Sequence, residues 1–316
     1  MPTSDSAMLP GMSREPSAKP RVTFVGAGNL ANALALSLCE AGYEIEQIVS
    51  REDPSSLRRA QRLAHKVGAT AITISRARIQ SEVVWFCVPD RAIASAAKSM
   101  AACADWTGKV ALHSSGALAS DELTALRSRG ASIASVHPLM TFVRGSRPSL
   151  AGVPFAVEGD SAAVRVARRI VKNLGGHAYS LRKEDKAAYH AWGTFASPLL
   201  TALLVTSEHV AAVAGIERKT AKKMMLPMIR QTLANYAALE AAQAFSGPII
   251  RGDVETVKRH LRTLRSLPVA RDVYLSLARA ALAHLPGKNK RTLERALKSA
   301  RNLLTRNLST RISGRG

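Results

Sequence analysis

The stretch Arg21-Val22-Thr23-Phe24-Val25-Gly26-Ala27-Gly28-Asn29-Leu30-Ala31 decides the fold. A short run of β-formers leads into two glycines, and apolar residues then recur at helical spacing. In a G-x-G-x-x-A turn the first glycine permits the tight turn, the second lets backbone approach a pyrophosphate, and the small last position lets helix pack on strand. The pattern predicts cofactor contacts by Gly26, Ala27, Gly28, Asn29 and Leu30. The alternative is a structural glycine turn in an ordinary α/β protein.

Length and composition suggest two domains with a large core, since the chain has 316 residues and 47% of them are hydrophobic. We expect no secretory signal, and no uninterrupted apolar run approaches the roughly 20 residues of a membrane span. Cys39, Cys87 and Cys103 fall in apolar segments without C-x-x-C spacing. They are therefore interpreted as reduced core residues of a cytoplasmic protein.

The residue pattern changes near Leu181, where short apolar strands are followed by long stretches with helical periodicity. The predicted fold class is α/β, a Rossmann-type, doubly wound, mainly parallel sheet followed by an all-α domain. The predicted segments are a disordered leader (1–19), an NADP-binding domain (20–181), a helical domain for substrate binding and homodimerisation (182–285) and a basic tail (286–316).

The formal net charge of +22 is concentrated in part at the C-terminal end. A basic tail can contact nucleic acid or acidic surfaces. Residues 286–316 have no aromatic residue for base stacking and no nucleic-acid-binding motif. We therefore favour a solvated basic helix, and expect nucleic-acid binding only through this tail, if at all.

The choice of cofactor is read from the end of the second predicted strand, where NAD-specific sites commonly place an acidic residue. Here the chain has Ser50-Arg51, with Arg58 and Arg59 close behind. Ser50 can donate a hydrogen bond and Arg51 can face a 2′-phosphate, so NADP is favoured over NAD. The alternative is that Arg51 is a solvated loop residue. Val88 and Pro89, after a fully apolar strand, are predicted to wall the nicotinamide–ribose side.

Polar side chains follow the next two predicted strands, at the edge where open α/β sheets bind ligands. Ser114 is expected to contact substrate, and Ser115 is expected to contact the cofactor or position the substrate. His137 either contacts the reacting group or caps a loop, and the sequence leaves both open. Asp90 is predicted to cap the following helix.

Lys186, His190 and Ser197 share one face of a predicted helix, at i, i+4 and i+11. A lysine and a histidine one turn apart can bind a substrate oxygen and move a proton. The alternative is a solvated lysine and a core histidine. The position directly after the last strand favours the catalytic interpretation, with Ser197 binding substrate.

Further along the chain, Arg251 can hold a carboxylate or phosphate, whereas Asp253 is better explained as a helix cap. The remaining histidines lie scattered on predicted helices, and no spacing indicates a metal site.

Six segments together resemble bacterial Rossmann-like proteins with a helical C-terminal domain of unknown function: Gly26–Ala31, Val88–Asp90, His113–Gly116, His137–Leu139, Lys186…Tyr189-His190-Ala191 and Ser246–Asp253. That family is similar to pyrroline-5-carboxylate reductase, deazaflavin-dependent NADP reductases and β-hydroxyacid dehydrogenases. The resemblance implies an NADP-binding fold, a helical dimerisation domain and oxidoreductase activity, without a substrate.

The resemblance also extends to single residues. Lys186 and His190 look like the Lys and Asn one turn apart in β-hydroxyacid dehydrogenases, and His137-Pro138-Leu139 is similar to the His-Pro-Met segment of prephenate dehydrogenases. Where relatives tend to carry Ser-Asn, this chain has Ser197-Pro198. Proline cannot replace the asparagine side chain, which indicates an altered substrate or lost activity.

The sequence thus predicts an NADP-dependent oxidoreductase that moves a hydride to or from a small carbonyl, imine or hydroxy compound in an interdomain cleft. The alternative is a non-catalytic NADP-binding sensor or regulatory protein.

Overall fold

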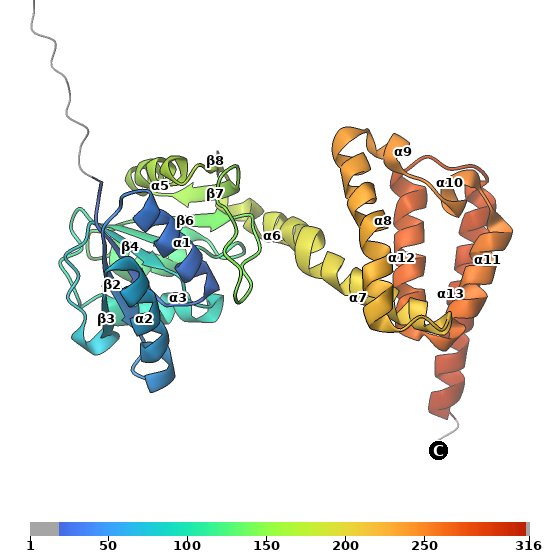
Figure 1. The fold of residues 1–316 in the computed structure, drawn as a ribbon, viewed down its shortest axis with the longest axis horizontal. Helices are drawn as coiled ribbons and strands as arrows, with labels where there is room; N and C mark the ends of the chain where they lie inside the picture. The colour runs from blue at the N-terminus through green and yellow to red at the C-terminus, as the bar shows by residue number, and fades with distance from the viewer. Residues whose placement is uncertain (1–18, 314–316) are drawn as a thin grey trace, which may run out of the picture. The chain divides into compact units, whose positions relative to one another are not determined.

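The computed structural model describes residues 19–313, with side chains as far as Arg301. The predicted leader lies almost wholly outside the described residues. The chain forms two compact units that divide between Thr194 and Phe195 (Figure 1). We call them the sheet unit and the helical unit and describe each by itself.

The sheet unit is built on one eight-stranded sheet in the order β3-β2-β1-β4-β5-β6-β7-β8. Every neighbouring pair is parallel except β6 and β7, which are antiparallel. The strands are β1 Val22–Val25, β2 Ile45–Ser50, β3 Thr70–Thr73, β4 Val83–Phe86, β5 Val110–His113, β6 Ser132–Pro138, β7 Pro154–Gly159 and β8 His177–Ser180. The chain reverses its direction of winding between β1 and β4, so their carboxyl ends form the switch point at which such sheets bind ligands.

Helices cover both faces of this sheet, which confirms the predicted doubly wound α/β fold (Figure 1). The helices α1, α2 and α5 pack on one face, with α2 over β2 and β3 and α5 over β5, β6 and β7, while α3 and α4 pack on the other face. The sheet unit contains α1 Asn29–Glu40, α2 Pro54–Val67, α3 Ile93–Met100, α4 Thr124–Arg127, α5 Ser161–Asn173 and α6 Lys186–Thr194, with short 3-10 turns η1 Ile74–Arg76, η2 Asp90–Ala92, η3 Ser120–Leu123 and η4 Lys183–Asp185.

The helical unit begins with a π-helical turn, Phe195–Leu199, that contains Pro198. Its helices are α7 Leu200–Val213, α8 Arg218–Ala238, α9 Ala241–Ala244, α10 Pro248–Arg251, α11 Val254–Thr263, α12 Pro268–His284 and α13 Lys290–Ser313, with a 3-10 turn Leu264–Ser266. The unit boundary lies later than the predicted 181/182. The reason is that η4 and α6 are bound to the sheet unit through Lys183 and Lys186.

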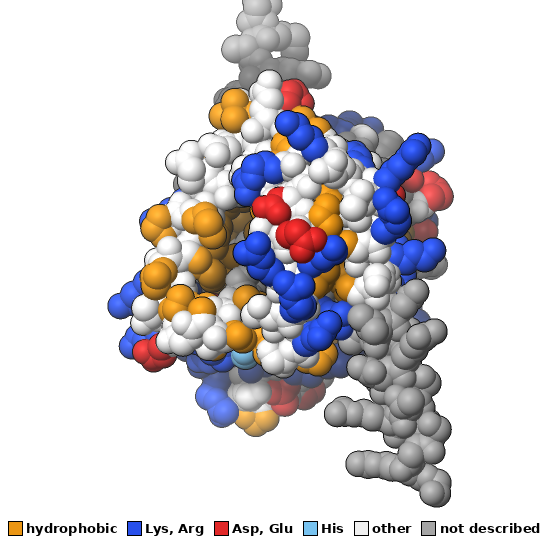
Figure 2. Space-filling model, turned by 90° about the vertical axis from the view of Figure 1, so that its right-hand side faces the viewer, with side chains coloured by type: hydrophobic (Ala, Val, Ile, Leu, Met, Phe, Trp, Pro, Cys, Tyr) orange, Lys and Arg blue, Asp and Glu red, His pale blue; other side chains and the backbone are white. Residues whose placement is uncertain are grey.

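The described part of the predicted basic tail forms the helix α13, one face of which packs on the rest of the helical unit. Leu293, Leu297 and Ala300 of α13 are buried and pack with residues of α11 and α12. Their i, i+4, i+7 spacing places them on one face of the helix, so the basic residues stay outside. Figure 2 faces the right-hand side of Figure 1 and shows Lys and Arg side chains (blue) spread over this surface.

One helical segment, Lys183–Val213, is long and apolar enough to cross a membrane by length and composition alone. The search of the sequence for an uninterrupted apolar run did not find this segment, because polar residues interrupt it. Its first part belongs to the folded sheet unit, because the Lys186 side chain is buried against β5 and β6.

All three cysteines are free, but the prediction that all are core residues is wrong for one of them. Cys39 is exposed near the end of α1, Cys87 is partly buried and Cys103 is buried. Burial raises the pKa of the Cys87 thiol above its ordinary range.

Candidate functional site

The glycine turn after β1 has the backbone that the sequence pattern predicts. Gly26 has φ +104°, and a Cβ there would lie 2.5 Å from the carbonyl oxygen of Cys87. Only glycine fits, because both the conformation and the close approach exclude a side chain. Ala31 is fully buried, so α1 packs directly on the sheet.

Gly28 plays a different part in the same turn. It stands at the N-cap of α1 in extended conformation, and a Cβ added there would meet no atom within 4 Å. The N–H groups of the first helical turn have no partner within the helix, and their dipole favours an anion. Ala27 and Leu30 pack against the core, and the Asn29 amide donates to the carbonyl of Phe142 at 3.2 Å. The turn therefore leaves an open anion-binding position beside Gly28.

The end of β2 carries Ser50 and Arg51 as expected. The Ser50 hydroxyl donates to the Arg51 carbonyl at 3.0 Å, and the Arg51 side chain is 73% exposed. One Arg51 nitrogen lies 3.4 Å from Asp53 and donates to Ser56 at 3.1 Å. Asp53 also caps α2, where hydrogen bonds from Ser55 and Ser56 hold its pKa well below the usual range. The guanidinium is thus presented at the surface, with one carboxylate beside it.

The end of β4 places Val88 and Pro89 next to the glycine turn. Val88 Cγ1 lies 3.0 Å from the position of a Cβ on Gly26, and Pro89 is exposed. The predicted helix cap at Asp90 is wrong, since no side-chain cap bond forms there. Asp90 instead accepts a hydrogen bond from the Ser115 hydroxyl at 2.9 Å, because the loop after β5 lies alongside it.

The two serines after β5 are engaged with the protein itself. The Ser114 hydroxyl accepts a hydrogen bond from the Trp85 indole at 2.8 Å. The Ser115 hydroxyl, besides donating to Asp90, accepts from the N–H groups of Ala117 and Leu118. The Ser115 hydroxyl is thus fully engaged in shaping the loop, whereas the Ser114 hydroxyl accepts from Trp85 and keeps its own hydrogen to donate.

His113 holds this loop by hydrogen bonds to Ser115 and Ala119, a role that the sequence reasoning missed. Its Nδ1 accepts the Ser115 N–H at 3.1 Å, so the ring proton resides on Nε2, which donates to the Ala119 carbonyl at 2.9 Å. Burial lowers the pKa of His113 to about 4. The ring is therefore neutral at pH 7.

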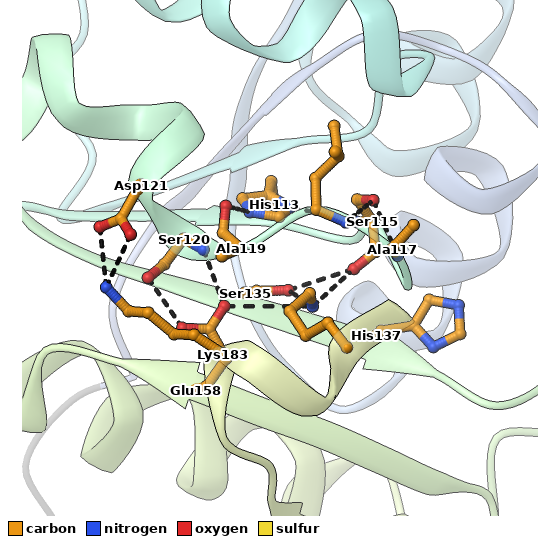
Figure 3. A network of polar contacts seen from close by, with 12 residues as sticks. His113, Ser115, Ala117, Ala119, Ser120, Asp121, Ser135, His137, Glu158 and Lys183 are labelled. Atoms are coloured by element: carbon orange, nitrogen blue, oxygen red, sulfur yellow. Dashed lines mark hydrogen bonds and ion pairs between the residues drawn. The ribbon is translucent and has the colours of Figure 1, made fainter. Parts of the chain in front are cut away.

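Lys186 is 1% exposed and reaches the loop that holds Ser115, which Figure 3 labels. Its Nζ donates to the Ser115 carbonyl at 3.0 Å and to the Ser135 hydroxyl at 2.7 Å. Burial lowers its pKa, an effect opposed by the nearby carboxylates of Glu158 and Asp90. Because these bonds direct the ammonium group into the protein, Lys186 has the geometry of a residue that holds the site together.

Glu158 on β7 is the second residue that the sequence reasoning missed. It is buried 4.0 Å from Lys186 Nζ, and it accepts hydrogen bonds from the Ser120 N–H at 2.7 Å and hydroxyl at 2.9 Å. Figure 3 shows Glu158 and Ser120 joined in this network. A signal was present, since Glu158 is the one charged residue in an otherwise apolar strand, and buried charges need partners.

His137 and His190 meet above Gly116. A Cβ on Gly116 would lie 2.8 Å from His137 Nε2 and 2.7 Å from His190 Cδ2. The His137 Nδ1 is 3.1 Å from the hydroxyl of Tyr189, a residue the sequence reasoning noted only within the family motif. Burial and the Lys186 charge lower the pKa of His137 to about 4. His190 is exposed. The structure thus brings two imidazoles together at the carboxyl edge of β5 and β6.

The other two predicted substrate residues belong to the helical unit. Ser197 lies in the π-helical turn, where its carbonyl accepts from the Thr201 hydroxyl at 3.2 Å. Arg251 is the exposed last residue of α10. Asp253 caps α11 by accepting from the Thr256 N–H at 3.0 Å, as predicted. Among residues with described side chains, no group of three or more His, Cys, Asp or Glu is placed to hold a metal ion.

Comparison with known proteins agrees with this architecture. Residues 10–138 match the family described as Rossmann-like domain, and residues 153–281 match the domain of unknown function DUF2520. The chain is 27% identical over 207 residues to a pyrroline-5-carboxylate reductase from Haemophilus influenzae, covering 65% of this chain and 73% of that protein.

Two solved structures show the same fold at lower identity. A candidate NADP oxidoreductase from Bacteroides fragilis has a TM-score of 0.70 at 23% identity, covering 83% of this chain and 97% of that one. A reductive aminase from Aspergillus terreus in complex with NADPH has a TM-score of 0.60 at 16% identity, covering 87% and 98%. Matches to a Rossmann-like domain and to DUF2520 thus cover the two parts of the chain in turn, and the predicted dinucleotide-binding fold is confirmed.

Proposed function

We propose that this protein is an NADP-dependent oxidoreductase that transfers a hydride to or from a small carbonyl, imine or hydroxy compound. The observation that carries the proposal is the turn at Gly26 and Gly28, placed at the switch point of the sheet with open space at the N-terminus of α1. The likeness to a pyrroline-5-carboxylate reductase and to a reductive aminase bound to NADPH supports the reaction class.

The residues present fit a dinucleotide with a 2′-phosphate. The first-turn N–H groups of α1 would hold the pyrophosphate, and the close approach at Gly26 keeps that turn narrow. The exposed Arg51 guanidinium would bind the 2′-phosphate by paired hydrogen bonds. The bound cofactor would supply the hydride.

The two histidines above Gly116, His137 and His190, would position the substrate and transfer a proton to it. A carbonyl or imine that gains a hydride at carbon also needs a proton at oxygen or nitrogen, and histidine is the side chain best suited to supply it near neutral pH. The exposed His190 is our candidate for this proton transfer, because every hydrogen bond of the Lys186 ammonium group goes into the protein. His137 would position the substrate, and Lys186 would hold the Ser115 loop in place.

The test begins with titration of the purified protein with NADPH and NADH, followed by nicotinamide fluorescence. We expect tighter binding of NADPH. Arg51→Ala should weaken it about 10- to 100-fold while leaving NADH nearly unchanged, since a charged hydrogen bond contributes about 1.5–3 kcal/mol. Arg129→Ala, an exposed arginine before β6, is the matched control.

A screen of small aldehydes, ketones and imines with NADPH then tests turnover. Binding without turnover of any of them would favour the sensor or regulatory alternative. Binding of neither cofactor would contradict the proposal as a whole.

We also propose that the helical unit forms a homodimer. On α8, Met224, Met228 and Tyr236 form a stripe at helical spacing, and each is at least 62% exposed. Contiguous exposed apolar surface of this kind indicates an interaction site.

A further inference from the structure

The His137 ring is held at one nitrogen and open at the other. Its Nδ1 lies 3.1 Å from the Tyr189 hydroxyl, and the two rings are perpendicular with centroids 5.5 Å apart. Its Nε2 takes part in no hydrogen bond with the described residues and lies 2.8 Å from the position of a Cβ on Gly116. Any ligand above Gly116 would therefore meet Nε2.

The direction of the Tyr189 bond follows from what each group can do. Burial raises the pKa of Tyr189 to about 12, so the phenol keeps its proton at pH 7. The pKa of His137 is lowered to about 4, so the ring is neutral with a single N–H. Within the described part of the chain, the Tyr189 hydroxyl has His137 as its only hydrogen-bond partner. Donation to Nδ1 satisfies that hydroxyl hydrogen, whereas the reverse arrangement leaves it without an acceptor among the described residues.

We infer that Tyr189 is a positioning residue that fixes the tautomer of His137: its hydroxyl donates to Nδ1 and leaves the ring proton on Nε2, facing the substrate. As far as the substrate is concerned, this inference rests on the proposed function. A neutral N–H donor matches an atom with a free lone pair, such as a carbonyl oxygen, and not a protonated iminium. His137 then polarises the carbonyl without losing its proton, and His190 carries out the proton transfer.

The tautomer can be measured without substrate or cofactor. We would record long-range ¹H–¹⁵N correlations of the histidine rings in the ¹⁵N-labelled protein at pH 7, with His137→Gln to assign the His137 signals. We expect Nδ1 to resonate as an unprotonated nitrogen and Nε2 as a protonated one. A proton on Nδ1, or on both nitrogens, would overturn the inference even if NADPH binds as proposed.

The chain supplies a matched control for the loss of the hydroxyl. In the helical unit, His260 Nδ1 lies 3.1 Å from the Tyr274 hydroxyl, with perpendicular rings 5.8 Å apart. Tyr189→Phe should convert His137 to a mixture of tautomers, while Tyr274→Phe should leave the His137 signals unchanged. An unchanged His137 tautomer in Tyr189→Phe would also overturn the inference. If that variant fails to fold, the wild-type measurement still decides.

Kinetics with an aldehyde or ketone from the substrate screen separate positioning from a structural role. Tyr189→Phe should lower kcat about tenfold with little change in KM, as expected for one lost hydrogen bond. The amide nitrogen of His137→Gln supplies a donor near the Nε2 position that has no second tautomer, so adding Tyr189→Phe to that variant should lower kcat no further. A second tenfold loss in the double variant would show that Tyr189 acts only through packing.

Discussion

The sheet unit and the helical unit differ in what they bury. In the sheet unit Trp85 and Trp106 are fully buried between helices and sheet, Trp192 on α6 is 60% exposed, and the buried charges of Lys186 and Glu158 lie 4.0 Å apart. In the helical unit the buried cluster lies among α11, α12 and α13, and large apolar side chains of α8 are exposed. The sheet unit thus pairs its buried Lys186 and Glu158 within one chain, whereas α8 of the helical unit exposes a stripe of apolar side chains of the kind that marks an interaction site.

This difference also separates the two kinds of residue in the site. The polar network under the Ser115 loop is internal and fixed by hydrogen bonds to β5, β6 and β7. A charge taken out of water is tolerated only when it is paired and hydrogen-bonded. The network therefore ties stability of the sheet unit to the shape of its candidate site.

The largest expected effect breaks this network. Lys186→Met should lower the free energy of unfolding of the sheet unit by about 3–5 kcal/mol, because it leaves the buried Glu158 without its cation. Urea unfolding followed by the fluorescence of Trp85 and Trp106, in a shared Trp192→Phe background, measures the change. Lys183→Met is the control. Lys183 forms a surface ion pair with Asp121, whose loss should change stability by about 1 kcal/mol or less. Equal losses in the two variants would contradict the role given to Lys186.

The second prediction concerns acid. His113 and His137 have folded-state pKa values of about 4, below the ordinary 6.5, so the unfolded chain binds their protons more readily. Their contribution to stability is complete above pH 6.5 and is lost as the pH falls toward 4. At pH 5 the sheet unit should be less stable than at pH 7 by about 2 kcal/mol for each of the two histidines.

Urea midpoints between pH 7 and pH 5 test this prediction. His113→Gln should remove about half of the pH dependence, whereas His65→Gln, at an exposed position on α2, should leave it unchanged. A pH dependence that His113→Gln does not reduce would contradict the burial argument.

The same contrast explains what the sequence could reveal. The fold was predictable because the Gly26–Ala31 turn and the apolar strands are local patterns, and the sheet order follows from them. His137, Lys186 and His190 were identifiable as polar residues at strand ends or on one helix face. Glu158 stood out only as a charge in an apolar strand and His113 only as part of a family segment. Their roles were not predictable, because their partners Ser120, Lys186 and Ser115 are set by how the strands and loops pack. Asp90 was misread as a cap for the same reason.

The smallest expected effect comes from a substitution on α8, which tests whether the exposed apolar side chains of the helical unit form a dimer interface. Met228 is 67% exposed on α8, and Met224 one turn away is 62% exposed. If α8 lies in a dimer interface, Met228→Glu removes an apolar contact from each of the two protomers. At about 1 kcal/mol for each, the loss raises the dimer dissociation constant about 30-fold. Size-exclusion chromatography with light scattering over a concentration series measures this shift. Met140→Glu, an exposed methionine of the sheet unit at 39%, is the matched control and should leave the dissociation constant unchanged. A monomeric wild-type protein, or a dimer that tolerates Met228→Glu, would contradict this assignment and leave the exposed stripe of α8 to a different partner.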